Sequence, residues 1–413
     1  MSKTMDYSKF ISARSQARSP SAIRALMKYL DAPGMISLGA GAPNKATFPF
    51  ASMQVTLKDG SQLSIDQQLF ESSLQYSATP GLPQLTNFLR ELQLAEHNPP
   101  HKDFSVSIGV GSQDLIAKAF EMVIEPGCNI MLENPSYTGI VSFLHTQPCN
   151  LVSVSTDAEG IMPQSLESIL KNWEDVATRP KVLYTIPTGS NPTGVTVSLE
   201  RKKAIYKICQ EYDILIMEDD PYYFLQFCNP RVPSFYSMDV DGRVLRFDSL
   251  SKILSAGLRL GWVTGPKELV DRIIMHTMVT NLQASGVPQA MAATLLNQWG
   301  LEGFFKHIDS VGEFYREKRD VFLECAERRL KGYAEWTVPQ AGMFVWLKLL
   351  NGITDSNKLI TSAAIEKKVL AVPGVAFVPS GEPTPYVRVS FSNVTPENMD
   401  EALKRLAEVV QEQ

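Results

Sequence analysis

The middle of the chain alternates short apolar runs with amphipathic stretches. The run VSIGV (106–110) has the length of a β-strand, and LIAKAFEMVI (115–124) repeats apolar residues at helical spacing. A second helix is predicted at ERKKAIYKICQEYD (200–213). Further strands are predicted at NIMLENP (129–135), KVLYTIP (181–187), DILIMEDDP (213–221) and RVLRFDS (243–249). This alternation predicts an α/β fold in which helices cover a mostly parallel sheet.

The pattern changes after about residue 300. A long amphipathic helix is predicted at 304–330, half-buried strands at 342–349 and 386–392, and a terminal helix at 398–413. Strands that face a helical layer on one side indicate a smaller α+β domain. We therefore expect three parts, namely an N-terminal segment (1–45), a large domain (46–300) and a small C-terminal domain (301–413).

Polar residues close several of the predicted strands. In parallel sheets, ligands bind at the carboxyl ends of the strands, so these residues are candidates for one shared site. They are Glu133–Asn134, Pro187–Thr188, Asp219–Asp220 and Ser249.

Composition narrows the class of protein. Of 413 residues, 44% are hydrophobic and 20% charged, and the formal net charge of −5 disfavours nucleic acid or an anionic membrane as the main partner. The five cysteines are scattered and odd in number, which favours a reducing compartment over a disulfide framework, and the five histidines show no metal-ligand spacing. No apolar run reaches the roughly 18 to 20 residues that span a bilayer. We expect no metal and no membrane partner.

The first 30 residues carry six basic side chains and one acid, Asp6. Serine and arginine with few acids are typical of a transit peptide, whereas the alternative is a basic first helix of the mature protein. The second interpretation is favoured. It implies a cytoplasmic protein, with the mitochondrial matrix as the other possibility.

Two short motifs are individually weak. GVGSQD (109–114) follows a strand and opens a helix, but Asp114 stands where a dinucleotide fingerprint needs its third glycine. Backbone N–H groups at a helix start beside Ser112 still suit a phosphate, although many such turns bind nothing. SNPTG (190–194) is a turn sequence whose simplest interpretation is a loop. Alternatively, Asn191 contributes its side-chain amide to a site.

The stretch EDDPYYF (218–224) places two acids at the end of an apolar strand. Burial of such a charge requires a positive partner, which an arginine, a lysine or a protonated ligand nitrogen could supply. The spacing Asp-x-x-Tyr occurs twice, as Asp219 with Tyr222 and as Asp220 with Tyr223.

The segment SLSKILSAGLRLGW (249–262) surrounds Lys252 with small residues and places Arg259 seven positions later. Desolvation lowers the pKa of a buried lysine and yields a nucleophilic amine. Small neighbours would admit the ring of an aldehyde cofactor, and an arginine can bind its phosphate in bidentate fashion. An exposed lysine in a loop is the simpler alternative, but it explains neither the small residues nor Arg259. Together with an acid for a ring nitrogen, these features fit pyridoxal phosphate (PLP).

At this point the motifs resemble a known family. SLSKILSAGLRLG resembles the lysine signature of the class I/II PLP-dependent aminotransferases of fold-type I, and GSQD, SNPTG, EDDPYYF and YVRVSFS follow the same order over about residues 20–410. MISLGAGAPN (35–44) and LQYSATPGLPQL (74–85) are similar to the kynurenine/2-aminoadipate aminotransferase branch.

The resemblance implies a role for each matching residue. Lys252 would form a Schiff base with PLP and act as general base, Asp219 would pair with the pyridine nitrogen, and Tyr222 would bond the ring oxygen. The family's Asp-x-x-Tyr register makes Asp220 and Tyr223 second choices. The other implied cofactor contacts are Ser112, Gln113, Tyr137, Asn191, Ser249, Ser251, Arg259 and, from a partner subunit, Tyr76.

The resemblance also implies the substrate contacts. Arg388 would bind the α-carboxylate together with Asn191 and Tyr137. Arg24 and Gly41 would line the pocket for the rest of the substrate, and the N-terminal segment would pack with the small domain or the partner of a homodimer. Ala42 departs from the branch, which more often has a bulkier apolar residue there. The donor therefore stays open among kynurenine, 2-aminoadipate, aromatic and branched-chain amino acids.

The implied reaction moves an α-amino group to 2-oxoglutarate by a ping-pong mechanism. A PLP-dependent lyase or decarboxylase would keep Lys252, Asp219 and Arg259 and differ in its products. A regulatory protein on this fold would need a DNA-binding domain ahead of the roughly 20 residues that precede the resemblance, and such a domain typically needs about 50 or more. The failed third glycine disfavours a dinucleotide-dependent dehydrogenase.

Overall fold

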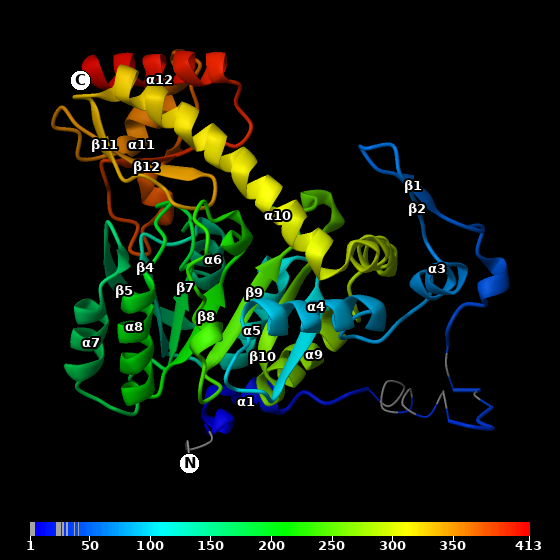
Figure 1. The fold of residues 1–413 in the computed structure, drawn as a ribbon. Coiled ribbons are helices and arrows are strands. Elements are labelled where there is room, and N and C mark those ends of the chain that lie inside the picture. The colour runs from blue at the N-terminus through cyan, green and yellow to red at the C-terminus, as the bar shows by residue number, and fades with distance from the viewer. Residues whose placement is uncertain (1–4, 22–25, 27–28, 30–31, 37, 40) are drawn as a thin grey trace. The chain divides into compact units, whose positions relative to one another are not determined.

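A computed structural model describes residues 5–21, 26, 29, 32–36, 38–39 and 41–413 (Figure 1). The chain divides into two compact units. The first unit comprises the chain up to Glu125 together with Asp239–Phe305, and the second comprises Pro126–Met238 together with Lys306–Gln413.

The first unit contains three strands in the order β3-β10-β9, with β10 antiparallel to both neighbours. Gly261, which begins β10, lies opposite both Ser249 at the end of β9 and Gly109 at the end of β3. These three chain ends therefore meet at one edge. The elements of this unit are α1 (Ala13–Gln16), β1 (Gln54–Thr56), β2 (Gln62–Ser64), α3 (Gln67–Ser73), α4 (Pro83–Glu96), β3 (Phe104–Gly109), α5 (Ser112–Val123), β9 (Val244–Ser249), β10 (Gly261–Pro266) and α9 (Lys267–Thr280).

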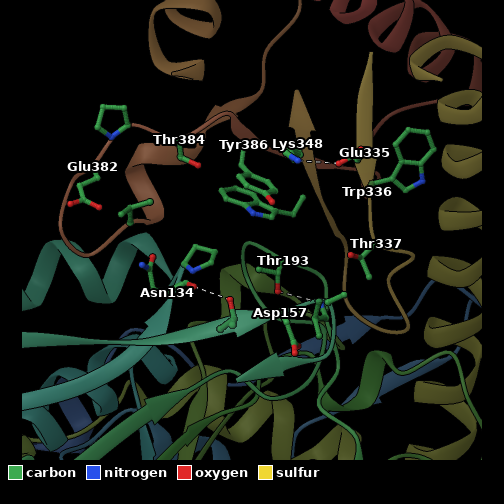
Figure 2. A pocket seen from close by; sticks show the side chains of 17 residues that line it. Asn134, Asp157, Thr193, Glu335, Trp336, Thr337, Lys348, Glu382, Thr384 and Tyr386 are labelled. Atoms are coloured by element: carbon green, nitrogen blue, oxygen red, sulfur yellow. Dashed lines mark hydrogen bonds and ion pairs between the residues drawn. The ribbon is translucent and has the colours of Figure 1, made fainter. Parts of the chain in front are cut away.

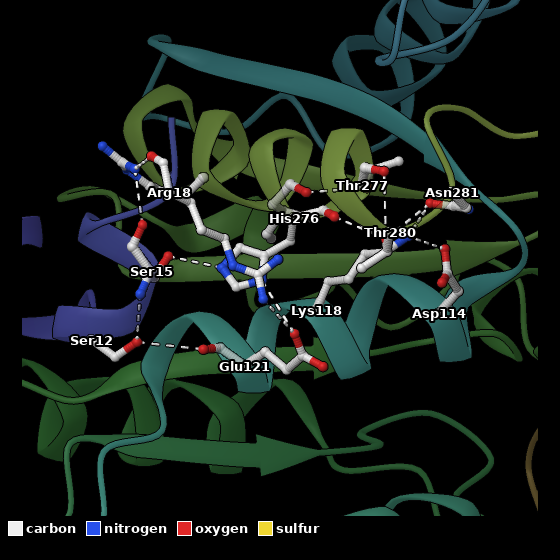
Figure 3. Close-up of polar contacts among 12 residues, drawn as sticks. Ser12, Ser15, Arg18, Asp114, Lys118, Glu121, His276, Thr277, Thr280 and Asn281 are labelled. Atoms are coloured by element: carbon white, nitrogen blue, oxygen red, sulfur yellow. Dashed lines mark hydrogen bonds and ion pairs between the residues drawn. The ribbon is translucent and has the colours of Figure 1, made fainter. Parts of the chain in front are cut away.

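The N-terminal segment is fixed to α5 and α9 through a buried polar cluster (Figure 3). The Ser15 hydroxyl lies 2.8 Å from Nε2 of His276, and Nδ1 of that ring lies 3.4 Å from a Glu121 oxygen that also pairs with Arg18. Burial lowers the pKa of His276 to about 4, helped by the positive charge of Arg18. Arg272 donates to the backbone oxygens of Ser15 and Arg18. This part of the segment is thus built into the folded unit.

The second unit contains a sheet with the order β8-β7-β4-β5-β6, in which β8, β7, β4 and β5 are parallel and β6 is antiparallel. Every residue of β7 and β8 is buried, as expected for parallel strands that are covered on both faces. Its elements are β4 (Cys128–Asn134), α6 (Thr138–Leu144), β5 (Cys149–Asp157), β6 (Gly160–Ile161), α7 (Pro163–Lys171), β7 (Val182–Thr185), α8 (Leu199–Tyr212) and β8 (Leu215–Asp219).

A four-stranded antiparallel sheet with the order β11-β12-β14-β13 belongs to the same unit. Trp346 of β12 lies opposite Arg388 of β14. The elements are β11 (Ala334–Trp336), β12 (Phe344–Leu349), α11 (Ser356–Leu359), β13 (Val372–Pro373), β14 (Tyr386–Ser390) and α12 (Pro396–Gln411). The long helix α10 (Gly286–Leu330) is interrupted at Gly300, whose φ of 62° is not helical.

The predicted α/β class is confirmed, and each strand predicted in the middle of the chain contains or overlaps an observed one. Capping explains several boundaries. Ser198 accepts a bond from the N–H of Arg201 at the start of α8, and Thr395 accepts one from Asn398 before Pro396 opens α12. The predicted helix at 304–330 is the second part of α10.

Candidate active site

The carboxyl ends of β4, β7 and β8 meet at one edge of the second unit because these strands are parallel neighbours. Asp219 is the last residue of β8, and Asn191 lies in the turn that follows β7. This edge therefore collects several of the polar residues that the strand pattern predicts to face one site, including Glu133 near the end of β4.

Arg388 of β14 points its guanidinium at the turn after β7. Its Nη1 donates to Oδ1 of Asn191 over 2.9 Å. The guanidinium also lies over two rings, 4.4 Å from the centre of Phe344 and 5.2 Å from that of Phe377. Within the described chain, its buried Nε has no hydrogen-bond partner. Burial lowers the pKa of Arg388, while Tyr222 and Tyr137 oppose that shift.

Asp219 is 3% exposed and accepts a hydrogen bond of 2.6 Å from the Tyr184 hydroxyl. Burial raises the pKa of Tyr184, and the charge of Asp219 adds to the shift, so the phenol stays a donor. The other acid of the motif, Asp220, is also buried, and its backbone oxygen accepts from the N–H of Tyr223. The charge of Asp219 also acts on Tyr222, another predicted site residue.

Tyr222 lies beside the same group. Its ring meets that of Phe344 edge-on, with 5.7 Å between ring centres. Burial raises the pKa of Tyr222, with a contribution from Asp219, whereas Arg388 and a hydrogen bond with Asn191 act in the opposite direction. The ring of Tyr137 lies over Gly139, where an added Cβ would come within 2.6 Å of it. The second unit thus brings together Tyr137, Asn191, Asp219, Tyr222 and Arg388.

Lys252 lies in the first unit, in a tight turn that follows β9. The turn is closed by a bond of 2.8 Å from the N–H of Leu254 to the oxygen of Leu250. The Ser249 hydroxyl accepts from the N–H of Ser251 over 3.1 Å, which fixes both serines beside the lysine. The small residues of the motif therefore shape the turn around Lys252.

Arg259 faces the start of α5 in the same unit. A Cβ added at Gly111, whose φ is 82°, would lie 2.6 Å from Nη2 of Arg259, so the guanidinium reaches the backbone only because that residue is glycine. A Cβ added at Gly261 would likewise come too close to the backbone nitrogen of Ser112, the first residue of α5. Gln113 is the second residue of that helix. The helix start therefore offers N–H groups and a guanidinium to an anion.

Two further predicted residues, Tyr76 and Gly41, belong to the first unit. The Tyr76 ring is 54% exposed, and its N–H is bonded by the side chain of Gln75. Gly41 has no atom within 4 Å of an added Cβ. Arg24 lies outside the described residues.

A separate hollow of about 500 Å³ opens in the second unit (Figure 2). Tyr386, stacked on Trp346 with 5.3 Å between ring centres, faces Thr193 and Asp157 across it. Asn134, one of the strand-closing residues predicted to face the shared site, lines it, but none of the cofactor or substrate contacts that the resemblance implies does. It adjoins the predicted site through Thr193, two residues after Asn191.

Sequence reasoning missed Tyr184 entirely and missed the partners of Glu133. Tyr184 lies within an apolar strand, where a tyrosine is ordinary core, and only its bond to Asp219 reveals a role. Glu133 was predicted to face the shared edge, but its partners Thr185, Ile186 and Ser190 lie more than 50 residues away in the sequence. An acid at the end of an apolar strand was the available signal for Glu133.

Comparisons with known proteins identify the family of the chain. The chain is 45% identical to kynurenine/alpha-aminoadipate aminotransferase, mitochondrial, of Bos taurus, over 99% of this chain and all of that protein. The structure of aminotransferase Aro8 from Candida albicans superposes with a TM-score of 0.90 at 30% identity, covering 99% of both chains. The Pyrococcus horikoshii kynurenine aminotransferase, solved with pyridoxamine phosphate (PMP), has a TM-score of 0.77 at 30% identity and 98% coverage of each chain.

The family described as aminotransferase class I and II matches residues 33–406. The predicted enzyme class is therefore confirmed, and the lyase and regulator alternatives are not favoured. Within the described residues, no helix combines the length and the apolar character needed to cross a membrane. This chain belongs to the class I and II aminotransferases, and it is a transaminase.

Proposed function

We propose that the enzyme is a PLP-dependent aminotransferase of kynurenine, 2-aminoadipate or an aromatic amino acid, with 2-oxoglutarate as the amino acceptor. The observation that carries the proposal is Arg388. A half-buried guanidinium that donates to Asn191 and whose buried Nε has no partner within the described chain is suited to bind the α-carboxylate of an amino acid. The names of the relatives support the substrate class.

The residues present fit the cofactor. For its phosphate, the first unit supplies the start of α5 with Ser112 and Gln113, the fixed pair Ser249 and Ser251, and the guanidinium of Arg259. For its ring, the second unit supplies Asp219, Tyr222, Asn191 and Tyr137. A carboxylate held by Tyr184 is the partner that a protonated ring nitrogen requires.

When bound, PLP supplies an electron sink for the pair left on the substrate Cα. The chain supplies the proton transfers. Lys252 would hold the cofactor through its aldehyde and would take the Cα proton of the substrate on Nζ as general base. Arg388 and Asn191 would hold the α-carboxylate and so orient the substrate for this transfer. Gly41 and Arg24 are proposed to contact the rest of the substrate.

We also propose a homodimer in which Tyr76 reaches the cofactor phosphate of the partner. The support is a set of exposed apolar side chains in the first unit, since isolated soluble chains rarely leave such sets uncovered. Ile36 is 88% exposed, Leu38 99% and Phe50 65%.

For location, we propose the cytoplasm, with the mitochondrial matrix as the alternative that the relatives' names favour. Residues 5–18 include the buried Tyr7, Phe10 and Ser15, so a leader cleaved after them would remove part of the folded unit. Fractionation of cells and sequencing of the mature N-terminus distinguish the two.

The test combines one variant with a donor panel. Purified protein should carry a visible absorbance that fades when an amino donor is added and returns with 2-oxoglutarate. Lys252→Ala should lose this cycle entirely, with transamination reduced by at least about 10⁴-fold, because both the covalent bond and the general base are gone. Measurable turnover by Lys252→Ala would refute the assignment. Release of carbon dioxide without stoichiometric glutamate would identify a decarboxylase instead.

A further inference from the structure

Glu133 is a buried acid that the proposed chemistry does not use. It lies one residue before the end of β4 and is 5% exposed. Its Oε1 accepts from the Thr185 hydroxyl and, over 3.1 Å, from the N–H of Ile186. Its Oε2 accepts from the Ser190 hydroxyl over 3.2 Å. One carboxyl thus joins the ends of β4 and β7 to the turn that follows β7.

That turn carries Asn191 directly after Ser190. It is closed by bonds from the N–H of Ser190 to Val195 and from that of Gly194 to Ser190, of 2.9 and 2.6 Å. A Cβ added at Gly194 would lie 2.4 Å from the backbone oxygen of Phe344, so β12 packs against the turn too closely for any side chain there. The turn is therefore held by β12 through backbone contact and by Glu133 through hydrogen bonds.

The position of Asn191 in turn influences the position of the Arg388 guanidinium. Its Oδ1 is the acceptor for Nη1 of the guanidinium. A turn that shifts would carry Asn191 with it and change where the remaining donors of Arg388 point. Misplacement of a binding group by about 1 Å can cost a large factor in rate or binding.

We propose that Glu133 is a positioning residue for the carboxylate-binding pair Asn191 and Arg388, acting through the Ser190 hydroxyl. The inference rests on the proposed function, in which Arg388 binds the substrate α-carboxylate. A buried acid costs folding free energy, which an apolar residue at the end of β4 would avoid. The three hydrogen bonds that Glu133 accepts hold the turn in place, and this explains why a buried acid occupies the position.

The decisive comparison uses two hydroxyls on the same carboxyl. Ser190→Ala removes the donor on the turn, and Thr185→Val removes the donor on β7, outside the turn. Loss of one such bond corresponds to about 0.5–1.5 kcal/mol, or roughly two- to tenfold in an equilibrium. In the holoenzyme, Ser190→Ala and Glu133→Gln should raise KM for the amino donor about three- to tenfold with little change in kcat. Thr185→Val should change KM less than about twofold.

A readout that ignores the α-carboxylate separates positioning from general damage. Hydroxylamine attacks the bound cofactor but carries no carboxylate, so its rate should be the same in all three variants. A parallel loss of hydroxylamine reactivity and of the thermal midpoint would mean that Glu133 is merely structural, and would overturn the inference. If Glu133→Gln fails to fold, the Ser190 and Thr185 pair decides alone.

Arg388→Lys distinguishes failure of the inference from failure of the proposed function. If this change raises KM strongly while Ser190→Ala does not, Arg388 binds the α-carboxylate and Glu133 has no positioning role. If Arg388→Lys leaves KM unchanged, Arg388 does not bind the α-carboxylate and both proposals are wrong.

Discussion

At the scale of single residues, the carboxylate of Asp219 depends on a neighbour that no motif contains. Tyr184 donates to it from within β7 over 2.6 Å, and both groups are buried. A hydrogen bond to a charged group contributes about 1.5–3 kcal/mol. The hydrogen bond from Tyr184 therefore stabilises the Asp219 carboxylate as a partner for a protonated ring nitrogen.

Tyr184→Phe should weaken cofactor binding about tenfold or more, because the carboxylate loses a charge-stabilising donor and becomes easier to protonate. The measurement is a PLP titration of the apoenzyme. Tyr315→Phe, the same change on α10 at a half-buried position, is the control and should leave the dissociation constant unaltered. Equal affinities in both variants would show that Asp219 needs no help from Tyr184.

Glu133 makes a prediction about pH. Burial raises its pKa to about 7, with a further contribution from Asp219, while the bonds from Thr185, Ile186 and Ser190 oppose the shift. Since the folded state holds this proton more tightly than the unfolded state, the associated stability is present below about pH 4.5 and is lost as the pH rises through 7. The change corresponds to about 3 kcal/mol.

Glu133→Gln does not titrate, so its stability relative to the parent enzyme should improve by about that amount between pH 4.5 and 8. Urea unfolding at a series of pH values measures the difference. If the difference in unfolding free energy between the two proteins is the same at every pH, the pKa of Glu133 is not raised.

At the scale of elements, the start of α5 illustrates how a weak motif gains a function. The half-fingerprint GVGSQD predicted an anion site only as one possibility, because sequence shows the helix start but not what faces it. The structure adds Arg259, which arrives from the turn before β10 and packs on Gly111. Strands and helices were predictable from period and capping, whereas the antiparallel β10 was not, since its direction depends on β3 and β9.

Gly111→Ala should displace the Arg259 guanidinium and weaken PLP binding. Gly127→Ala is a matched control because Gly127 has a similar φ of 79° but no atom within 4 Å of an added Cβ. Gly127→Ala should lose about 1 kcal/mol of folding free energy from its positive φ, and Gly111→Ala about 1–3 kcal/mol, because its φ of 82° and ψ of 165° are essentially restricted to glycine. Only Gly111→Ala should also raise the PLP dissociation constant, by about tenfold, as titration of the two apoenzymes would reveal. Equal affinities would exclude Arg259 as a phosphate ligand.

At the scale of the whole molecule, the sequence predicted the enzyme class because its motifs keep their order along nearly the entire chain. The proposed homodimer rests on the resemblance and on exposed apolar side chains. In the pattern of apolar residues, Ile36 and Leu38 look like an ordinary buried strand, and only their exposure in the structure marks them as candidates for an interface. Burial against a second copy would account for side chains that the unit itself leaves uncovered.

Leu38→Glu should therefore shift the enzyme towards monomers, because a charge in an apolar interface loses its hydration without gaining a partner. Leu370→Glu, which changes an 82% exposed leucine of the second unit, is the control. Sedimentation velocity over a range of concentrations should show a weakened dimer for Leu38→Glu alone. Activity should fall in proportion to the monomer fraction, because each proposed phosphate site takes Tyr76 from the other subunit. A parent enzyme that sediments as a fully active monomer would refute the shared site, since a single chain would then supply every contact its cofactor needs.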